Sequence, residues 1–591
     1  MGERRCGPAG ADLSSGPGAV LGLWDGHDAG VALIAAGRVL FALSEERPGR
    51  RKRASGFPRL ALRECLAWAR SHEIFPAHVA LAGCWGRAPQ RLVEVLYRGS
   101  DPHREPLGPA SRAAMAWEGA AARLAGLRRV ERAIGRLTVR TRLAGHGTSN
   151  LPWQLIDHHE AHALSALLGP RPAGALVITC DAYGDGVSAT VRRSDQPLET
   201  TVRLPAPGGP ALLYGAVTVA LGFREGDEGK VTGLAARGDP GQLVGPIRAL
   251  FRQDSPAPRL CQPLRRRQVE ALIAGVPRED VAAALQVVTE EILCGWIGRL
   301  LEGEGGSAPL LVAGGLFANV ALNRTLAGLP GARGFHVFPH MGDGGLAVGA
   351  AHALWFRLTG RPCHPLTNMA LGTAFDREAA GAAARSAGLA VHEPEAPAAA
   401  IAAHLRAGRI VCRFTGRDEL GPRALGNRSI LFSARDPALG ARVNRALGRD
   451  DCMPFGPVIA ADDAAACLRE PPAGVDLDHM TVALDTTGSF RRECPGAVHV
   501  DGTARVQVVD RESAPELLAL LGAYREAGGE RALINTSFNL HGEPIVHSPR
   551  DAVRTFLASG LDVLYLGDLE CTASRPRESS AERSGEPTTI G

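Results

Sequence analysis

The sequence predicts an α/β protein of two domains joined by a short linker. Its 591 residues exceed the usual size of one domain, and its hydrophobic content of 45% suits large buried cores. Short apolar runs that end in glycine-rich polar turns alternate with segments of helical periodicity. A segment rich in proline and glycine at 359–374 separates two such regions. We therefore expect domains at 19–358 and 375–572, with a disordered lead at 1–18 and a disordered tail at 573–591.

The N-terminal domain opens with three expected strands. Residues 20–24, 31–35 and 39–44 are apolar, and a polar glycine turn separates the first two runs. A strand, a polar glycine turn and a second strand open the actin-like ATPase fold, in which such turns hold phosphate. His27 lies in this turn and is a candidate for contact with a bound molecule. A turn histidine without a role is the alternative.

The most informative stretch is 157–162, which reads Asp-His-His-Glu-Ala-His. His158 and His162 are four residues apart, so on a helix they share one face. Asp181 follows the apolar run 175–180, and Asp343 follows a strand-like segment at 334–338. Two imidazoles and two carboxylates suit a divalent cation, and these donors allow iron, zinc or manganese alike. A histidine pair on a solvated helix is the alternative.

Glycine-rich turns beside these aspartates predict a nucleotide-binding site. Strand, paired glycines and helix N-terminus follow one another from residue 310 onward, and backbone N–H groups in such turns can approach phosphate. An ordinary turn is the alternative for the glycines taken alone. Residues 108–145 are expected to form an inserted helical region and 279–302 a long helix, and no internal repeat is visible. The candidate nucleotide-binding residues are Gly184, Gly186, Gly314, Gly315 and Asn319.

The chain contains only two lysines, Lys52 and Lys230, against a large number of arginines. Lys230 lies in the polar segment 226–235 and is a candidate for a role that needs a compact ammonium group. The alternative is that this lysine has remained by chance and has no special role. Lys52 belongs to the basic run 50–53. That run is expected to be either a solvated loop or a collector of anionic substrate.

The C-terminal domain carries arginines in glycine-rich turns, which suits phosphate or carbamate oxygens. Residues 410–414 form an expected strand, and the segment 416–430 that follows contains three arginines, among them Arg423. Residues 499–509 are expected to form a strand pair that displays Arg505. The expected strand 532–539 ends in Ser537 and Asn539, which would face the same side.

These motifs together resemble the O-carbamoyltransferase family, whose members act on nodulation factors and on antibiotics such as tobramycin. The motifs are HHEAH at 158–162, AGGLFANVALN at 313–323, GPRALGNRSI at 421–430, HVDGTARVQ at 499–507 and INTSFN at 534–539. The resemblance spans about 20–570. It implies an N-terminal actin-like (ASKHA) domain similar to the threonylcarbamoyl-transferase that modifies tRNA. It also implies a C-terminal YrdC-like domain that makes carbamoyl-adenylate.

The resemblance also implies roles for individual residues. His158, His162, Asp181 and Asp343 would hold a metal, with Fe(II) the implied ion, and His27 and Lys230 would be catalytic. Arg423, Arg505, Ser537 and Asn539 would form the carbamoyl-phosphate and ATP site. The sequence departs from many relatives at Leu447, where they carry lysine. Arg449 is expected to supply the missing positive charge.

The sequence thus predicts an ATP-dependent O-carbamoyltransferase that uses carbamoyl phosphate, with Mg²⁺ accompanying ATP, to modify a hydroxyl of a small molecule. A tRNA-modifying carbamoyl-type transferase and a nucleotide-binding protein without catalysis are the alternatives. A net charge of +4 does not favour nucleic acid, and no apolar run approaches the roughly 20 residues of a membrane span. The 12 cysteines include no CxxC pair, which is typical of a reduced, cytoplasmic protein. A homodimer is compatible with the sequence.

Overall fold

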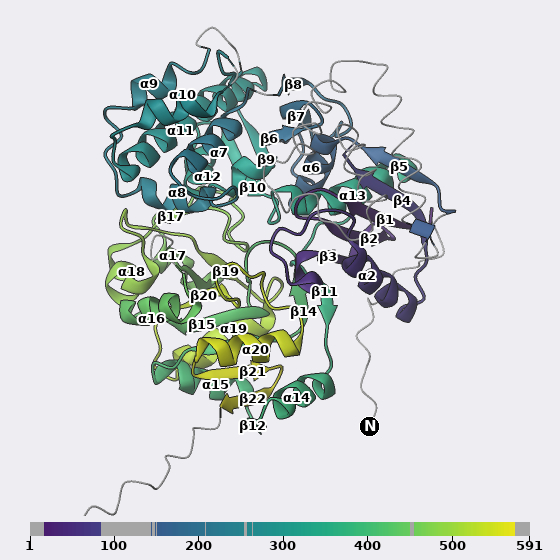
Figure 1. Ribbon diagram of the computed structural model, residues 1–591, viewed down its shortest axis with the longest axis vertical. Helices are drawn as coiled ribbons and strands as arrows, with labels where there is room; N and C mark the ends of the chain where they lie inside the picture. The colour runs from purple at the N-terminus through teal and green to yellow at the C-terminus, as the bar shows by residue number, and fades with distance from the viewer. Residues whose placement is uncertain are drawn as a thin grey trace, which may run out of the picture.

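The computed structural model describes residues 17–573 apart from 84–142, 145–147, 149, 207, 253–256, 263 and 450–453. Nearly all of the expected helical insertion at 108–145, and the expected lead and tail except for a few residues, lie outside the described residues. The described chain is mixed α/β and has an N-terminal and a C-terminal half, drawn in the upper and lower parts of Figure 1. This confirms the predicted fold class.

The N-terminal half contains two five-stranded sheets with the same topology. In each sheet, the first three strands along the chain are antiparallel, and the fourth and fifth run parallel to the first. The order is β3-β2-β1-β4-β5 in one sheet and β10-β9-β6-β7-β8 in the other. The expected strand–turn–strand opening is confirmed, and the repeated topology, which the sequence did not reveal, agrees with the actin-like expectation. The strands are β1 (Ala19–Trp24), β2 (Gly30–Ala35), β3 (Arg38–Ser44), β4 (Pro76–Ala82), β5 (Trp153–Ile156), β6 (Leu176–Gly184), β7 (Val187–Arg193), β8 (Val202–Pro205), β9 (Ala308–Ala313) and β10 (Ala332–Val337).

Two helices pack against each other between these sheets, α6 (His158–Ala166) against the second and α13 (Leu346–Thr359) against the first. Gly349 on α13 permits their close approach, because a Cβ atom there would lie 1.8 Å from the carbonyl oxygen of Ala161. All nine residues of α6 are buried. The helix that carries the predicted histidine ligands is therefore fixed on both faces by the core, which is what a site of defined geometry needs.

The second sheet is flanked by a helical group, seen at the upper left of Figure 1. It contains α7 (Pro210–Ala220), α8 (Glu228–Ala235), α9 (Val244–Arg248), α10 (Arg266–Ile273), α11 (Arg278–Gly303) and α12 (Val320–Ala327). The long helix expected at 279–302 is confirmed as α11. By length and composition α11 also meets the criteria for a membrane-crossing helix, but 61% of its most apolar window is buried inside the protein. A core helix meets the same criteria.

The C-terminal half is built on a mixed eight-stranded sheet of order β12-β22-β21-β13-β15-β20-β16-β19. Its strands are β12 (Leu389–His392), β13 (Val411–Phe414), β15 (Arg428–Ser433), β16 (Gly456–Ala460), β19 (Gln507–Val509), β20 (Ala532–Ser537), β21 (Val563–Leu566) and β22 (Leu569–Ala573). Its helices are α14 (Arg377–Ser386), α15 (Pro397–Arg406), α16 (Pro437–Leu447), α17 (Ala464–Cys467), α18 (Gly488–Glu493), α19 (Pro515–Glu526) and α20 (Pro549–Ser559). The expected strands at 410–414 and 532–539 are present as β13 and β20, although β20 ends before Asn539.

Two local expectations differ from the structure. Part of the expected linker, Ala370–Ala374, forms strand β11, which pairs with β14 (Arg417–Glu419). The segment 499–509 is not a strand pair. Its two strands belong to different sheets, because β18 (Thr503–Ala504) pairs with β17 (Leu484–Asp485) and β19 pairs with β16. Arg505 lies between β18 and β19, where the chain passes from one sheet to the other.

Helix α1 (Glu46–Gly49) and Arg50, the first residue of the basic run, tie the two halves together. Arg47 is 2% exposed and donates from Nη1 to Asp418 Oδ1 at 2.8 Å and from Nη2 to the carbonyl oxygens of Glu419 and Gly421. Arg50 donates to the carbonyl oxygens of Pro544 and Ile545 in the C-terminal half. At Arg50, the alternative of collecting anionic substrate therefore gives way to a structural role.

We expect Arg47→Met to lower the free energy of unfolding by about 3–5 kcal/mol, since removing one partner of a buried ion pair leaves the other charge unpaired. Asp418 is 1% exposed and would be that charge. Chemical denaturation measures the effect. Arg38→Met, at an exposed position of β3, is the control and should change stability by less than about 0.5 kcal/mol. Equal stability of the two variants would contradict the role of Arg47.

A second contact between the halves predicts a pH dependence. His547 lies 3.1 Å from Asp418 Oδ2 through Nδ1 and 3.1 Å from Glu64 Oε1 through Nε2. These carboxylates raise the pKa of His547 to about 9, against the desolvation that burial imposes. The contribution of protonated His547 to the free energy of unfolding is therefore complete below the ordinary histidine pKa of about 6.5. It is lost as the pH rises through about 9. We expect His547→Gln to lower the unfolding free energy at pH 6 more than at pH 10. Denaturation at both pH values checks this, and an equal effect would contradict it.

Candidate metal centre and anion site

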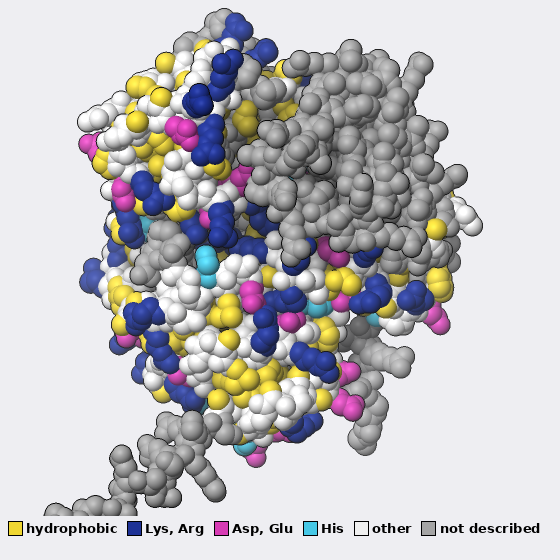
Figure 2. All heavy atoms as spheres, viewed as in Figure 1, with side chains coloured by type: hydrophobic (Ala, Val, Ile, Leu, Met, Phe, Trp, Pro, Cys, Tyr) yellow, Lys and Arg dark blue, Asp and Glu magenta, His cyan; other side chains and the backbone are white. Residues whose placement is uncertain are grey.

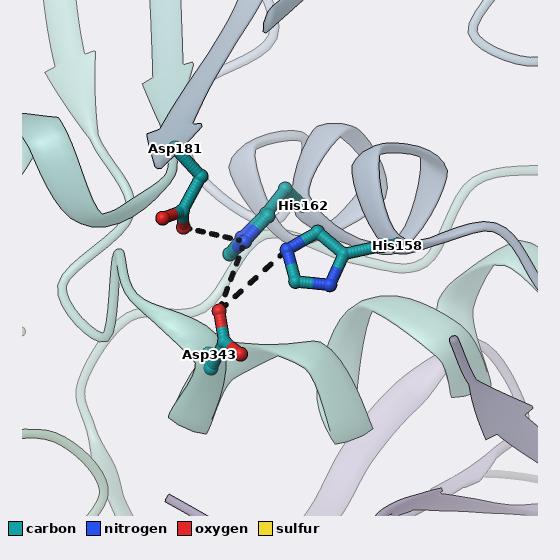
Figure 3. A group of neighbouring side chains, drawn as sticks. All are labelled: His158, His162, Asp181 and Asp343. Atoms are coloured by element: carbon teal, nitrogen blue, oxygen red, sulfur yellow. Dashed lines mark ion pairs between the residues drawn. The ribbon is translucent and has the colours of Figure 1, made fainter. Parts of the chain in front are cut away.

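Four predicted ligands meet at one point between the two sheets of the N-terminal half. The side chains of His158, His162, Asp181 and Asp343 each offer one ligand atom, and these atoms lie within 4.8 Å of one another. His162 Nε2 is 3.4 Å from Asp181 Oδ2 and 3.6 Å from Asp343 Oδ1. His158 Nε2 is also 3.6 Å from Asp343 Oδ1. Figure 3 shows the two imidazoles on one helix pointing toward carboxylates from separate elements.

The local sequence fixes each of these ligands. Asp157 caps α6 by accepting from the backbone N–H of Glu160, and Asp185 Oδ2 accepts from the N–H of His158. Asp181 Oδ2 accepts from the N–H of Gly315 at 2.9 Å. Asp185 was not selected from the sequence, although the segment 181–186 contained it. Its role depends on a contact 27 residues away in the chain, which the sequence does not show.

The predicted nucleotide-binding glycines lie around this centre. A Cβ atom at Gly184 would lie 2.1 Å from the His158 ring, and one at Gly314 would lie 2.2 Å from the carbonyl oxygen of Cys180. Gly315 supplies the N–H that Asp181 accepts, and Gly186 has a positive φ of 78° in the turn between β6 and β7. At Gly184 and Gly314 a side chain would therefore clash with a metal-ligand candidate or with the residue before Asp181, whereas Gly315 acts through its backbone N–H. A nucleotide role for these residues stays a prediction.

The donor set fits a divalent cation. His158 Nε2 and His162 Nε2 are buried and have no hydrogen-bond partner among the described residues. A buried nitrogen without a partner lowers the stability of the fold unless a bound ligand interacts with it. The nearby imidazoles lower the pKa of the Asp343 carboxyl below its usual range despite burial, so it is ionised. Two imidazole nitrogens and two carboxylate oxygens suit Fe(II), Zn²⁺ or Mn²⁺, and the geometry selects none of them.

His27 adjoins the metal centre, as the sequence suggested. Its Nε2 lies 3.1 Å from Asp343 Oδ2, its Nδ1 lies 3.0 Å from Asp28 Oδ2, and 56% of its side chain is exposed. The carboxylate of Asp343 raises the pKa of His27 to about 9. A cation held by Asp343 would offset that charge and return the pKa of His27 toward neutrality.

Two other predicted residues are engaged elsewhere. Asn319 caps α12 by accepting from the N–H of Leu322, and its amide donates to Gln286 Oε1 at 2.8 Å. Lys230 on α8 lies 3.5 Å from Asp227 Oδ2 and 5.9 Å from the centre of the Phe223 ring. These contacts do not involve the four metal-ligand candidates, and the assigned roles of both residues stay predictions.

A cavity of about 270 Å³ lies between the two halves and contains Arg423 and Arg505. The face in Figure 2 shows Lys and Arg side chains gathered along the band between the upper and lower parts. Arg423 Nε and Arg505 Nη1 are buried without a hydrogen-bond partner among the described residues. Burial lowers the pKa of both guanidinium groups, that of Arg423 to about 10, and Arg423 lowers that of Arg505 further. Two half-buried guanidinium groups, with no ion pair to a carboxylate among the described residues and each with a buried N–H group that has no partner there, suit an anionic ligand.

The opposite wall of this cavity comes from the N-terminal half. It consists mainly of small residues of α8, α11 and α12, with a few polar groups among them. The polar groups include Thr232 on α8, Gln286 and Glu290 on α11, and Arg324 on α12. The cavity is therefore complete only when the two halves are joined.

The remaining C-terminal candidates form a cluster around Arg449, away from the lining of this cavity. The Arg449 guanidinium donates to Thr536 Oγ1 at 2.9 Å, to Ser537 Oγ at 3.0 Å and to Asn539 Oδ1 at 3.0 Å. Asn539 uses its own amide N–H groups on the carbonyl oxygens of Leu540 and Glu543. All these acceptors of Arg449 are neutral, so its charge is not neutralised within the cluster. Leu447 is 2% exposed in the core at the end of α16.

Comparison with known proteins identifies the family. The family model described as the carbamoyltransferase N-terminus matches residues 147–352, and that of the carbamoyltransferase C-terminus matches 402–572. Nodulation protein NolNO of Sinorhizobium fredii is 30% identical over 92% of this chain and 78% of the relative. The chain belongs to the carbamoyltransferase family, and it is an enzyme of that class. This confirms the predicted family.

The name of a second relative states its activity. The 3'-hydroxymethylcephem-O-carbamoyltransferase of Streptomyces clavuligerus is 29% identical over 70% of this chain and 79% of the relative. Among solved structures, the (R)-2-hydroxyglutaryl-CoA dehydratase component A of Acidaminococcus fermentans matches 58% of this chain and all but 1% of its own. Its TM-score is 0.33 at 12% identity, which is too low to support any conclusion about this chain.

Proposed function

We propose that this protein is an ATP-dependent O-carbamoyltransferase that uses carbamoyl phosphate, through carbamoyl-adenylate, to modify a hydroxyl of a small molecule. The observation that supports it is the presence of two separate polar centres in one carbamoyltransferase chain. One is the His/Asp cluster beside His27, and the other is the arginine-containing cavity between the halves. Activation and transfer would each use one centre.

Activation suits the arginines of the C-terminal half. Carbamoyl phosphate and ATP are both anionic, so their approach requires fixed positive charge. Arg423 and Arg505 offer that charge in the cavity, and Arg449, which donates to Ser537 and Asn539, offers it in a separate cluster. In this proposal Ser537 and Asn539 orient Arg449. Water first cleaves carbamoyl phosphate to carbamate and inorganic phosphate. A carbamate oxygen then bonds to the α-phosphorus of ATP, and pyrophosphate leaves.

Transfer suits the N-terminal half. The acceptor hydroxyl attacks the carbamoyl carbon, the bond to the AMP oxygen breaks, and His27 accepts the hydroxyl proton. His158, His162, Asp181 and Asp343 would hold the cation, which when bound supplies positive charge for the phosphate and the carbamoyl oxygen. Because 56% of the His27 side chain is exposed, an acceptor can reach it. Three of the four ligand candidates are buried and Asp181 is half-buried, which limits competition by water.

A reaction with carbamoyl phosphate, ATP and a panel of hydroxyl compounds tests the proposal. The panel should include 3'-hydroxymethylcephem, the acceptor named in the Streptomyces clavuligerus relative. We expect one member to gain a carbamoyl group, with AMP and pyrophosphate formed in equal amounts, as measured by mass spectrometry. Carbamoyl transfer without any AMP would contradict the adenylate route. Carbamoylation of tRNA in place of these compounds would contradict the small-molecule acceptor.

A further inference from the structure

The cavity between the halves contains a histidine that neither proposed step uses. His499 lines this cavity beside Asp501, Arg423 and Arg505. Its side chain is 11% exposed, and its Nε2 atom is buried without a hydrogen-bond partner among the described residues. A buried ring nitrogen in a cavity wall without a partner indicates that a ligand group completes it.

Asp501 sets the chemical character of that nitrogen. Asp501 Oδ1 lies 3.4 Å from His499 Nδ1 and also accepts from the backbone N–H and the hydroxyl of Thr503. A tight turn supports the pair, because Gly502 N–H donates to the carbonyl oxygen of His499, and His499 N–H donates to that of Thr503. A carboxylate beside Nδ1 favours the tautomer that carries its proton there. Nε2 of the neutral ring is then a hydrogen-bond acceptor.

Two other side chains of the cavity wall, Gln286 and Glu290, already accept hydrogen bonds within the protein. Gln286 Oε1 accepts from Asn319 and from the Tyr214 hydroxyl. The two carboxylate oxygens of Glu290 accept from Gln286 and Thr325. By contrast, Arg423 and Arg505 can only donate. His499 Nε2 is thus a side-chain acceptor of a wall residue that has no partner among the described residues and could accept from an N–H group of a ligand held by the arginines.

We infer that His499 selects the carbamoyl group, with its Nε2 accepting a hydrogen bond from the carbamoyl NH₂ while Arg423 and Arg505 bind the phosphate end of the same molecule. This rests on the proposed function. It makes His499 a specificity-determining residue and Asp501 the residue that positions it. An acyl phosphate with a methyl group in place of NH₂ would fit the arginines but leave Nε2 without a partner. A site that hydrogen-bonds a substrate N–H discriminates against the analogue that lacks it.

Two stable phosphonates test this on the full-length protein by calorimetry. Phosphonoacetamide carries the NH₂ group, and acetonylphosphonate carries methyl in its place. We expect the unchanged protein to bind phosphonoacetamide at least about tenfold more tightly, the effect of one buried hydrogen bond. His499→Leu should bring the ratio close to one, with little change in the affinity for acetonylphosphonate. His499→Gln, which retains an acceptor oxygen, should restore part of the preference.

Asp501→Asn gives an independent test should His499→Leu fail to fold. The new amide would donate to Nδ1, place the proton on Nε2 and so reduce the preference for NH₂. His392→Leu, at an exposed position of β12, is the control and should keep the tenfold ratio. If folded His499→Leu or Asp501→Asn keeps the full preference, this inference is overturned and the proposed function stands. If the unchanged protein binds neither phosphonate, the carbamoyl-phosphate site itself is overturned together with the inference.

Discussion

His162→Ala is expected to lower carbamoyl transfer by at least about 100-fold and to remove the bound metal. His162 Nε2 is the ligand candidate that lies near both carboxylates, 3.4 Å from Asp181 and 3.6 Å from Asp343. Even residues that only support a metal ligand commonly contribute 10- to 100-fold in affinity or activity, so loss of a ligand should cost at least as much. Metal content by elemental mass spectrometry and transfer rate are the two measurements.

The same variant should leave activation intact, because the arginine-containing cavity lies on other elements. We therefore expect AMP formation from carbamoyl phosphate and ATP to stay within a few-fold of the unchanged protein. His392→Ala, on the exposed side of β12, controls for the loss of a histidine as such. Full metal content in His162→Ala would show that the cluster is not the metal site.

Arg505→Met is expected to lower AMP formation by about 100-fold or more while making the protein more stable. Arg505 Nη1 is buried without a hydrogen-bond partner among the described residues, and Arg423 adds a like charge nearby. Removal of one donor to an anionic group commonly costs 10²–10³ in rate. Because the burial of an unpaired charge is unfavourable, its removal should raise the free energy of unfolding by about 1 kcal/mol or more.

The control for this pair of effects is Arg445→Met, at an exposed position of α16. It should change neither AMP formation nor the free energy of unfolding by an appreciable amount. Activity assays and chemical denaturation of both variants measure the two effects together. A fall in stability of Arg505→Met comparable to that expected for Arg47→Met would indicate a structural ion pair and contradict the anion site.

The sequence predicted the metal cluster because local rules govern its parts. Histidines four residues apart share a helix face, and aspartates that follow strands lie at sheet edges. His158, His162, Asp181 and Asp343 therefore converge as expected. The family motifs indicated a carbamoyltransferase, and the family matches confirm that class.

The remaining features depend on contacts that no local pattern encodes. The repeated topology of the N-terminal sheets is not visible as a sequence repeat, because the same strand order can be built from unrelated residues. The cap that Asn319 provides for α12 and its hydrogen bond to Gln286 could not be predicted from the motif, and its nucleotide role stays a prediction. The cavity with Arg423, Arg505 and His499 forms only where the two halves meet, so its members could not be grouped from the sequence.

The central claim is that the C-terminal half activates the carbamoyl group and the N-terminal half transfers it. The most direct test is to block transfer and to measure the intermediate that accumulates. His162→Ala is supplied with carbamoyl phosphate, ATP and an acceptor, and the reaction is stopped in acid and analysed by mass spectrometry. We predict carbamoyl-adenylate and its breakdown product AMP, with the acceptor unmodified. Carbamoylation of the acceptor at the rate of the unchanged protein, or the absence of any adenylate, would contradict this division of roles.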